Sequence, residues 1–469
     1  MTKFDGGLGA RHVRLADLPQ AEIGDHIWHP VRRELGATGF GVGAYSAAKA
    51  GDVLVDTHDE EGSGSNHHEE LYVVLRGRAL FELDGRELDI GPEEFLLVAA
   101  ETRRGARALV DGTSVLVIGG TPGAVTPAPY EHWYAALTAD EPSGSAEIAA
   151  AGLVDHPRHG HLHYQLACFN ALAGDLDAAA RHLRQSVTSD ERAWSWLVDD
   201  VDLDALRDVA GRVPTRRTIG PVCVEQAGTG LDVVLLHAGI ADSRMWDPQW
   251  VAWPDARRIT RLDLRGFGRS GRPVGSFSHA GDVVAVLDEL SLERVVLVGA
   301  SLGGRVALEV ALARPGLVRG LVLAAPAVSG HSWSAEFEAF GEAEDEALAG
   351  GDVDRATDVN VDFWLPAAPD WVRAAVHEQQ HNAFVLQLGA AEESLLEADL
   401  ASRLSEIDVP SLVVVGDADR ADFQAITERL VRTLPDARRA TIAGANHLPS
   451  LEQPSAFDSA VLPFLDSLE

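Results

Sequence analysis

The feature that most constrains this chain is an apolar run that ends in Gly-x-Ser-x-Gly, within residues 295–304. Residues 295–298 have the composition of a buried strand, and residues 305–310 continue as a helix-forming stretch. A strand, a sharp turn and a helix around this motif make a nucleophile elbow, in which the glycines let the helix start against the sheet and leave the serine hydroxyl at the tip. We therefore predict that Ser301 is a catalytic nucleophile.

A serine hydroxyl needs a base within hydrogen-bond reach, and that base needs an acid to orient it. Residues 411–416 have the pattern of a buried parallel strand, followed by Asp417, Asp419 and Asp422. Carboxylates at the carboxyl end of such a strand lie where α/β sheets place their chemistry. We predict Asp419 as the acid, with Asp417 as a turn residue and Asp422 as a helix cap or solvated charge.

The predicted base is His447, which follows a short apolar strand near residues 440–442 and precedes a final helix beginning near Pro454. The order serine, acid, histidine along the chain is the order that a nucleophile elbow of this type requires. An isolated loop histidine has no such setting, so the prediction depends on the other two residues.

The developing negative charge on the substrate needs two hydrogen-bond donors. The backbone N–H of Leu302, directly after the nucleophile, is the first predicted donor. Residues 233–236 form an expected strand that ends in His237-Ala238-Gly239-Ile240, and we predict the N–H of Gly239 as the second.

Five sequence motifs, taken in their order along the chain, resemble those of the α/β-hydrolase family over about residues 218–469. The resemblance implies a doubly wound, mostly parallel sheet with a helical cap, and it assigns the triad acid to the last Asp of Gly-x-x-Asp, which is Asp419. A serine at the elbow argues against the haloalkane dehalogenase and epoxide hydrolase branches, which use an aspartate there. The matching segments are residues 237–239, 263–270, 299–304, 416–419 and 444–449.

About residues 330–406 resemble the cap that this family inserts above its pocket. The resemblance implies that apolar side chains of this part, together with those near the oxyanion loop, line the substrate pocket. The alternative is that the tryptophans only pack the cap onto the core, which is the favoured interpretation for Trp246. The candidate pocket residues are Ile240, Trp246, Trp364 and Trp371.

The composition bounds the cellular setting and the partners. The net charge of −33 argues against a nucleic-acid partner, because phosphates would be repelled. There is neither a signal-peptide pattern nor an apolar run of membrane-spanning length, and the two cysteines, Cys168 and Cys223, do not make a disulfide framework. We expect a cytoplasmic protein with no membrane partner.

The front of the chain, residues 1–128, has short, evenly spaced strand patterns typical of a small barrel or jelly roll. Glu70 and Gly77 match the acidic residue and the glycine of the first cupin motif, so this part resembles a cupin. The histidine positions of that motif fall in residues 62–66, and the adjacent His67 and His68 would face opposite sides of a strand. We predict a degenerate, metal-free cupin that serves dimerisation or ligand sensing.

Residues 129–213 have the pattern of a helical connector, in which residues 160–192 resemble one tetratricopeptide repeat. A single repeat does not make a solenoid, so we expect a packed connector between the front part and the hydrolase domain, residues 214–469.

The combined hypothesis is a serine hydrolase of the carboxylesterase or lactonase class, without cofactor or metal, acting on a small molecule. Three alternatives stay open: a small-molecule sensor that uses the cupin and a hydrolase-fold pocket, a carbon–carbon bond hydrolase, and a cupin metal oxygenase. A homodimer through the cupin-like part is a further expectation.

Overall fold

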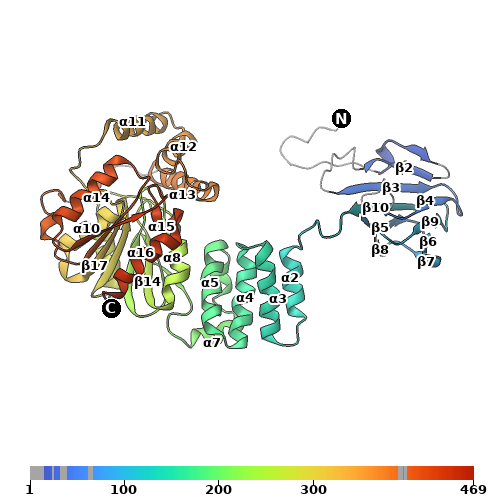
Figure 1. Cartoon of the computed structure of the whole chain (residues 1–469), viewed down its shortest axis with the longest axis horizontal. Helices are drawn as coiled ribbons and strands as arrows, with labels where there is room; N and C mark the ends of the chain where they lie inside the picture. Colours follow the sequence, from blue (N-terminus) through green and yellow to red (C-terminus); the bar gives the residue numbers. More distant parts are fainter. Residues whose placement is uncertain (1–14, 24–25, 32–39, 62–66, 389–393, 396–398) are drawn as a thin grey trace. The chain divides into compact units, whose positions relative to one another are not determined.

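The computed structural model places most of the 469-residue chain (Figure 1). Contacts divide the chain into two compact units, Met1–Pro127 and Ala128–Glu469. The residues that the structure describes are 15–23, 26–31, 40–61, 67–388, 394–395 and 399–469.

The described part of the first unit consists of antiparallel strands and one short 3₁₀ helix, η1 (Leu15–Asp17). One sheet has the order β1-β2-β3-β10-β5-β8, and the other has the order β4-β9-β6-β7. The strands are β1 (Ala21–Ile23), β2 (His26–His29), β3 (Gly41–Ala47), β4 (Val53–His58), β5 (Glu69–Arg76), β6 (Ala79–Leu83), β7 (Arg86–Ile90), β8 (Phe95–Val98), β9 (Arg104–Ala108) and β10 (Ser114–Gly120).

These two sheets share one hydrophobic core, in which Tyr72 packs edge-on against Phe81 with ring centroids 5.0 Å apart. The predicted β-rich character of this part is therefore confirmed. The closed cupin barrel is not: within the described residues the strands form two separate open sheets. Short strands with alternating burial specify a two-layered β unit, but not whether its edges join.

The second unit begins with a series of helices that pack in pairs along the chain (Figure 1). Gly174 ends one helix with φ +84°, and the Asp175 side chain accepts the Ala178 N–H to start the next. The helices are α2 (Pro129–Leu137), α3 (Pro142–Asp155), α4 (Gly160–Ala173), α5 (Leu176–Ser189), α6 (Ala193–Trp196), η2 (Val201–Leu203) and α7 (Asp204–Arg207).

A buried arginine joins these helices to the rest of the unit. Arg184 on α5 is 1% exposed, and its guanidinium donates to the Val251 carbonyl and to Asp255 at 2.6 Å. A buried arginine is tolerated only when its donors are matched in this way. The contact therefore fixes α5 against the following α/β part.

The remainder of the unit is built on a sheet of order β11-β12-β14-β13-β16-β17-β19-β20. β11, β12 and β14 pair antiparallel, and the other neighbours pair parallel. The strands are β11 (Thr215–Ile219), β12 (Val222–Ala227), β13 (Leu231–Leu236), β14 (Arg257–Asp263), β16 (Val295–Ala300), β17 (Val318–Ala324), β19 (Ser411–Gly416) and β20 (Ala437–Ile442), while β15 (Ser276–Phe277) pairs with β18 (Ser394–Leu395) apart from this sheet.

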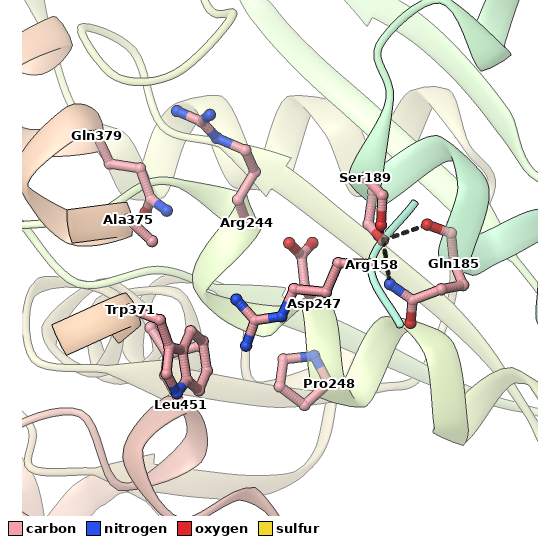
Figure 2. A pocket seen from close by; sticks show the side chains of 11 residues that line it. Arg158, Gln185, Ser189, Arg244, Asp247, Pro248, Trp371, Ala375, Gln379 and Leu451 are labelled. Atoms are coloured by element: carbon pink, nitrogen blue, oxygen red, sulfur yellow. Dashed lines mark hydrogen bonds between the residues drawn. The ribbon is translucent and has the colours of Figure 1, made fainter. Parts of the chain in front are cut away.

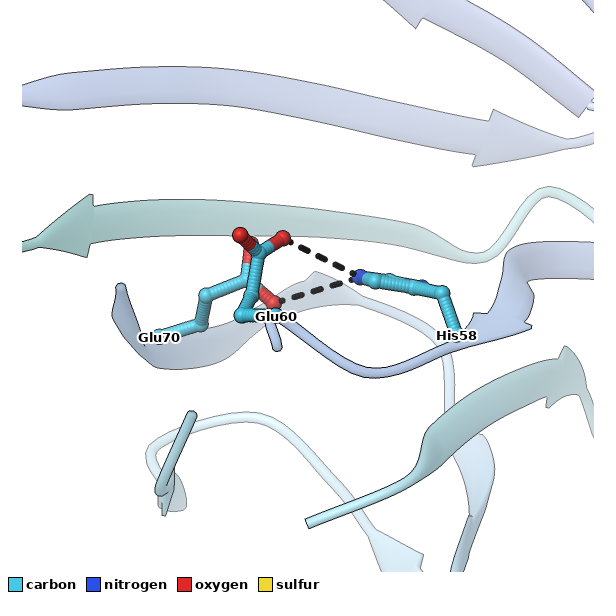
Figure 3. Close-up of side chains that lie close together, drawn as sticks. All are labelled: His58, Glu60 and Glu70. Atoms are coloured by element: carbon cyan, nitrogen blue, oxygen red, sulfur yellow. Dashed lines mark ion pairs between the residues drawn. The ribbon is translucent and has the colours of Figure 1, made fainter. Parts of the chain in front are cut away.

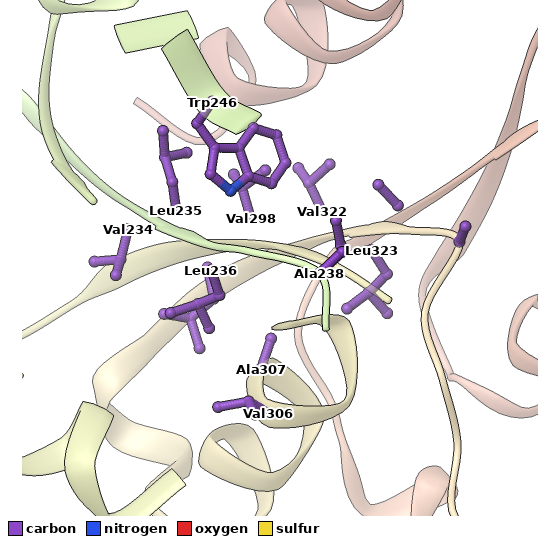
Figure 4. Packing of buried hydrophobic residues seen from close by; sticks show 14 of the residues in the cluster. Val234, Leu235, Leu236, Ala238, Trp246, Val298, Val306, Ala307, Val322 and Leu323 are labelled. Atoms are coloured by element: carbon purple, nitrogen blue, oxygen red, sulfur yellow. The ribbon is translucent and has the colours of Figure 1, made fainter. Parts of the chain in front are cut away.

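The central strands are continuous apolar runs because helices cover both faces of a parallel sheet. Figure 4 shows Val234, Leu235 and Val298 in this core, where each is fully buried. The strand order reverses between β13 and β16, and in open α/β sheets the carboxyl ends beside such a reversal are where ligands bind.

Helices surround this sheet, and three α-helices and the 3₁₀ helix η6 lie between β17 and β19 (Figure 1). No helix in the described part of the chain has both the length and the apolar content that crossing a membrane requires. The surrounding helices are η3 (Ser243–Trp246), α8 (Asp247–Ala252), η4 (Trp253–Asp255), α9 (His279–Glu289), α10 (Leu302–Ala313), η5 (Pro315–Leu317), η6 (Leu404–Glu406), α14 (Ala421–Thr433), α15 (Pro449–Glu452) and α16 (Pro454–Asp466), and the inserted ones are α11 (Ala335–Ala349), α12 (Val353–Trp364) and α13 (Asp370–Leu388).

Candidate active site

Ser301 stands at a strained turn between β16 and α10. Its φ of +48° and ψ of −110° lie where non-glycine residues are rarely found. A Cβ on Gly299 would lie 2.3 Å from the Gly303 carbonyl oxygen, and one on Gly303 would lie 2.2 Å from the Leu236 carbonyl oxygen. These close approaches explain both glycines, because α10 can begin against β13 and β16 only without those side chains.

Hydrogen bonds to the neighbouring strand hold the elbow in place. The Ser301 N–H donates to the Ala324 carbonyl at 2.9 Å, and the Ala327 N–H donates to the Ser301 carbonyl at 3.0 Å. Ala324 is the last residue of β17, and Ala327 lies in the loop that follows it. The strained backbone is thus fixed by its surroundings, as a strained functional residue must be.

Asp419 and His447 form a buried pair at the same edge of the sheet. The His447 Nδ1 lies 3.2 Å from each carboxylate oxygen of Asp419, and both side chains are 1% exposed. A carboxylate beside Nδ1 places the imidazole proton there, which leaves Nε2 free to accept a proton. β19 and β20, which precede these residues, run parallel to β16, so their carboxyl ends share an edge with the Ser301 elbow.

Sequence reasoning missed a residue that shapes the histidine loop. Glu452 is 5% exposed, and its carboxylate accepts hydrogen bonds from the Asn446 N–H, the Asn446 side-chain amide and the Leu448 N–H at 2.7 to 3.0 Å. These donors lie on either side of His447, so Glu452 fixes the backbone that carries the imidazole. An acidic residue in the first turn of a helix that begins at a proline is a helix-start signal that could have identified it.

Two aromatic rings enclose the imidazole. Trp364, at the end of α12, stacks on His447 with ring centroids 4.2 Å apart, and Phe423 meets it edge-on at 4.4 Å. Trp364 is 7% exposed. The inserted helices therefore contact the predicted base directly.

The loop that carries Asp419 also holds these inserted helices. Arg420, the next residue, donates to the Phe363 carbonyl at 3.1 Å and to Glu336 at 2.6 Å. Asp422 accepts hydrogen bonds from Ser334 Oγ at 2.6 Å and from the Ser334 N–H, and a third comes from His331.

The three aspartates after β19 thus have separate structural surroundings. Burial disfavours charge on Asp422, but the hydrogen bonds from Ser334 and His331 hold the pKa of its carboxyl below the ordinary value. Asp417 is exposed and accepts the Gly444 N–H at 2.8 Å. Of the three, Asp419 is the one that the structure pairs with His447.

The predicted oxyanion donors lie side by side. Leu302 is the first residue of α10, where a backbone N–H has no partner within the helix. A Cβ built on Gly239 would lie 3.7 Å from the Leu302 Cβ, so the two residues are in contact. His237 holds this loop: its buried imidazole accepts the Leu264 N–H at 2.9 Å, and burial lowers the pKa of His237 so that the ring stays neutral.

The candidate pocket residues do not form one group. Ile240 follows Gly239 and is 6% exposed. Trp246 is fully buried and packs against Phe457 in the core (Figure 4). Trp371 is 41% exposed and lines a different cavity, beside α5 (Figure 2). Spacing along the chain could not separate these environments, because each depends on which helix packs behind the ring.

In the first unit, the structure brings together side chains that sequence reasoning did not connect. The His58 Nε2 lies 3.7 Å from Glu60 and 3.6 Å from Glu70, and the three ligand-type atoms lie within 4.8 Å of one another (Figure 3). The fully buried Arg104 adds a guanidinium 3.6 Å from Glu70, and the Tyr72 hydroxyl donates to Glu70 at 2.5 Å.

Such residue types can ligate a metal, but here an arginine already supplies positive charge to Glu70. The hydrogen bond with Glu70 raises the pKa of His58. His67 and His68, which the motif comparison considered, are not among these residues. A histidine at the end of a strand, with a glutamate two residues later, was the available signal.

Comparisons with known proteins agree with this geometry. The profile of the "Alpha/beta hydrolase family" matches residues 233–460. A protein of Agrobacterium fabrum named "Putative carbamate hydrolase RutD" is 30% identical over 250 residues, covering 50% of this chain and 92% of that protein. A protein of the same name from Rhizobium rhizogenes is 32% identical over 251 residues, with the same coverage. The "3-oxoadipate enol-lactonase 2" of Acinetobacter baylyi is 28% identical over 233 residues, covering 46% of this chain and 82% of that protein. Through its C-terminal half, the chain belongs to the alpha/beta hydrolase family.

Proposed function

We propose that this protein is a serine hydrolase that cleaves an ester, a lactone or a related carbonyl compound through an acyl-enzyme on Ser301. The observation that carries the proposal is the strained Ser301 elbow at the sheet edge where Asp419 orients His447. Hydrolase and lactonase names among the relatives support the same reaction class.

In the proposed reaction, the Ser301 hydroxyl oxygen attacks the substrate carbonyl carbon while His447 Nε2 takes the hydroxyl proton. The carbonyl oxygen becomes an oxyanion, which the N–H groups of Gly239 and Leu302 receive. Collapse breaks the bond to the leaving group, and His447 returns the proton to it. Water then attacks the acyl-enzyme by the same route and releases the acid and free Ser301.

The acyl or ring portion of the substrate is proposed to lie against Ile240 and Trp364. Support comes from the position of Ile240 directly after the oxyanion donor and from the stacking of Trp364 on His447. Both are apolar surfaces, which favours an apolar group next to the scissile carbonyl.

A fluorophosphonate probe tests the proposed mechanism, because it reacts with an activated serine whatever the natural substrate is. We expect labelling of the wild-type protein, none of Ser301→Ala, and labelling of His447→Ala at least about 10³-fold slower. Equal labelling of wild type and Ser301→Ala would contradict the assignment. Hydrolysis of an ester and lactone panel by the same three proteins then distinguishes the substrate classes.

For the remaining parts we propose a degenerate cupin in residues 1–128, a tetratricopeptide-like connector in residues 129–213, and a hydrolase domain in residues 214–469 with its cap at about 330–406. The Gly77 backbone supports the first, since its φ is +79° and a Cβ would lie 2.4 Å from Thr113 Oγ1. The α4–α5 hairpin with its αL glycine supports the second.

We also propose that the first unit mediates homodimerisation. Edge strand β8 exposes Phe95 and Leu97, which are 72% and 61% exposed. Apolar side chains on an open sheet edge favour pairing with another chain. Light scattering of the wild type and of a Phe95→Asp, Leu97→Asp double variant tests this; the same monomeric mass for both would contradict it.

A further inference from the structure

A cavity lies between the helices that precede the α/β part and the inserted helices (Figure 2). Its volume is about 390 Å³, within the range of small-molecule sites. α5, η3, α8, α13 and α15 all contribute to its wall. None of the five residues proposed for catalysis lines it, so it is separate from the Ser301 site.

One wall of this cavity is a flat apolar platform. The indole of Trp371 is 41% exposed, and Pro248, Ala375 and Leu451 add apolar surface around it. Arg158 covers one face of this indole, so the uncovered part of the ring and these side chains are the flat apolar surface that a planar group can contact. The platform therefore favours a ligand with an aromatic or similarly flat body.

The cavity also holds the guanidinium of Arg158, for which the described part of the chain supplies no acidic partner. The Arg158 guanidinium carbon lies 4.3 Å from the centre of the Trp371 ring. Stacking uses only the face of the guanidinium and leaves its edge donors available in the plane. Within the described residues, no carboxylate forms an ion pair with Arg158.

The other charged groups of the cavity are already matched. Arg244 donates to Asp242 at 2.8 Å and to Glu378 at 2.7 Å. Asp247 accepts from Arg261 at 2.5 Å. Arg158 is accordingly the charge that remains for a ligand, and a cation of this geometry binds a carboxylate through two parallel hydrogen bonds.

The buried Gln379 adds a neutral donor. Its side-chain oxygen accepts the Asp242 N–H at 3.1 Å, which leaves the amide NH₂ to face the cavity (Figure 2). Gln379 is 4% exposed, so its orientation is fixed by packing.

We propose that this cavity is a binding site for a small aromatic carboxylate, whose ring packs against the part of the Trp371 indole that Arg158 leaves uncovered and whose carboxylate is bound by the edge donors of Arg158. The site is distinct from the catalytic one and does not depend on the proposed hydrolase activity. Because its wall includes α13 of the inserted helices and α15 just after His447, its ligand would contact both an inserted helix and the helix that follows the predicted base.

Calorimetric titration of the full-length protein tests the proposal with benzoate, 2-naphthoate and indole-3-acetate as probes. We expect saturable one-to-one binding of at least one of them, weakened about tenfold or more when its carboxylate is replaced by the neutral carboxamide. Binding should also weaken with added salt, because the recognised group is a charge at an open site.

Variants locate the binding. Arg158→Gln and Trp371→Ala should each weaken it about tenfold or more, whereas Arg403→Gln should not, since Arg403 is a surface arginine paired with Glu406 elsewhere. Ser301→Ala should bind as wild type does, which separates this site from the failure or success of the hydrolase proposal. No saturable binding up to about 10 mM, or equal affinity in Arg158→Gln, would overturn the inference.

Discussion

Replacing Asp419 with asparagine should nearly abolish hydrolysis while leaving the fold intact. One carboxylate oxygen of Asp419 accepts the Arg420 N–H at 2.8 Å, and both oxygens lie 3.2 Å from His447 Nδ1. An asparagine must keep its single oxygen toward Arg420, so its NH₂ group faces the imidazole. Nδ1 then has to accept a hydrogen bond, and the ring proton moves to Nε2, the atom that must receive the serine proton.

The expected cost follows from this wrong tautomer. A catalytic histidine held in that state loses on the order of 10⁴-fold in kcat, which is about 5 kcal/mol at about 1.36 kcal/mol per tenfold. The two side chains have nearly the same volume, and the site stays hydrogen-bonded. We therefore expect the midpoint of thermal unfolding to change by only a few degrees.

The assay is the rate of fluorophosphonate labelling, followed by kcat on whichever ester or lactone the wild type hydrolyses. Asp417→Asn is the matched control, because Asp417 caps a turn at the surface, and it should stay within about tenfold of wild type. Asp422→Asn should lower stability more than the intrinsic rate, because Asp422 anchors Ser334. Activity of Asp419→Asn within about tenfold of wild type, together with a collapse in Asp422→Asn, would refute the assignment of the acid.

Three further outcomes follow from the packing. Trp364→Ala should lower the free energy of unfolding by about 3–5 kcal/mol and reduce kcat, because the indole stacks on His447. Trp364→Phe should retain most of the rate. An unaltered kcat in the alanine variant would contradict this role of the indole. Gly303→Ala should fail to fold or should unfold at a much lower temperature, because its Cβ would lie 2.2 Å from a backbone carbonyl oxygen. Gly341→Ala, in open space on α11, is the control and should raise the free energy of unfolding by about 0.5–1 kcal/mol. Equal melting temperatures of the two variants would contradict the close approach at Gly303. Burial and neighbouring positive groups lower the pKa of His279 to about 3 in the folded protein, compared with an ordinary value of 6.5. Below pH 6.5 the unfolded chain therefore binds a proton at this histidine that the folded chain does not bind. The free energy of unfolding should fall as the pH falls from 6.5 to 3, by up to about 1.4 kcal/mol per pH unit. His279→Gln should flatten this part of the profile of melting temperature against pH, and an unchanged slope would contradict the assignment.

Local patterns predicted the hydrolase half well because its elements are specified by short segments. Residues 295–298 are apolar without interruption because β16 is covered on both faces, and the glycines beside Ser301 are required by contacts within the same turn. The strands before Asp419 and His447 follow the same rule.

The features that the sequence left unresolved depend on packing between distant segments. Trp246, Trp364 and Trp371 are alike in sequence, yet one lies in the core, one stacks on His447 and one lines a cavity beside α5. The expected barrel likewise depends on whether strand edges meet, which no single strand encodes. The grouping of His58 with Glu70 depends on the pairing of sheets rather than on spacing.

Residue order alone was enough to predict an elbow at Ser301, to select Asp419 and His447 as its proposed partners, and to identify the α/β class of the second half. Those inferences rest on backbone constraints and burial periodicity, which act within one strand or turn. The folded chain was needed to show that Glu452 holds the histidine loop, that Arg420 and Asp422 anchor the inserted helices, and that Arg158 meets Trp371 above a cavity. Each of these contacts joins side chains that become neighbours only when helices and strands pack, and packing is a property of the whole chain rather than of any segment.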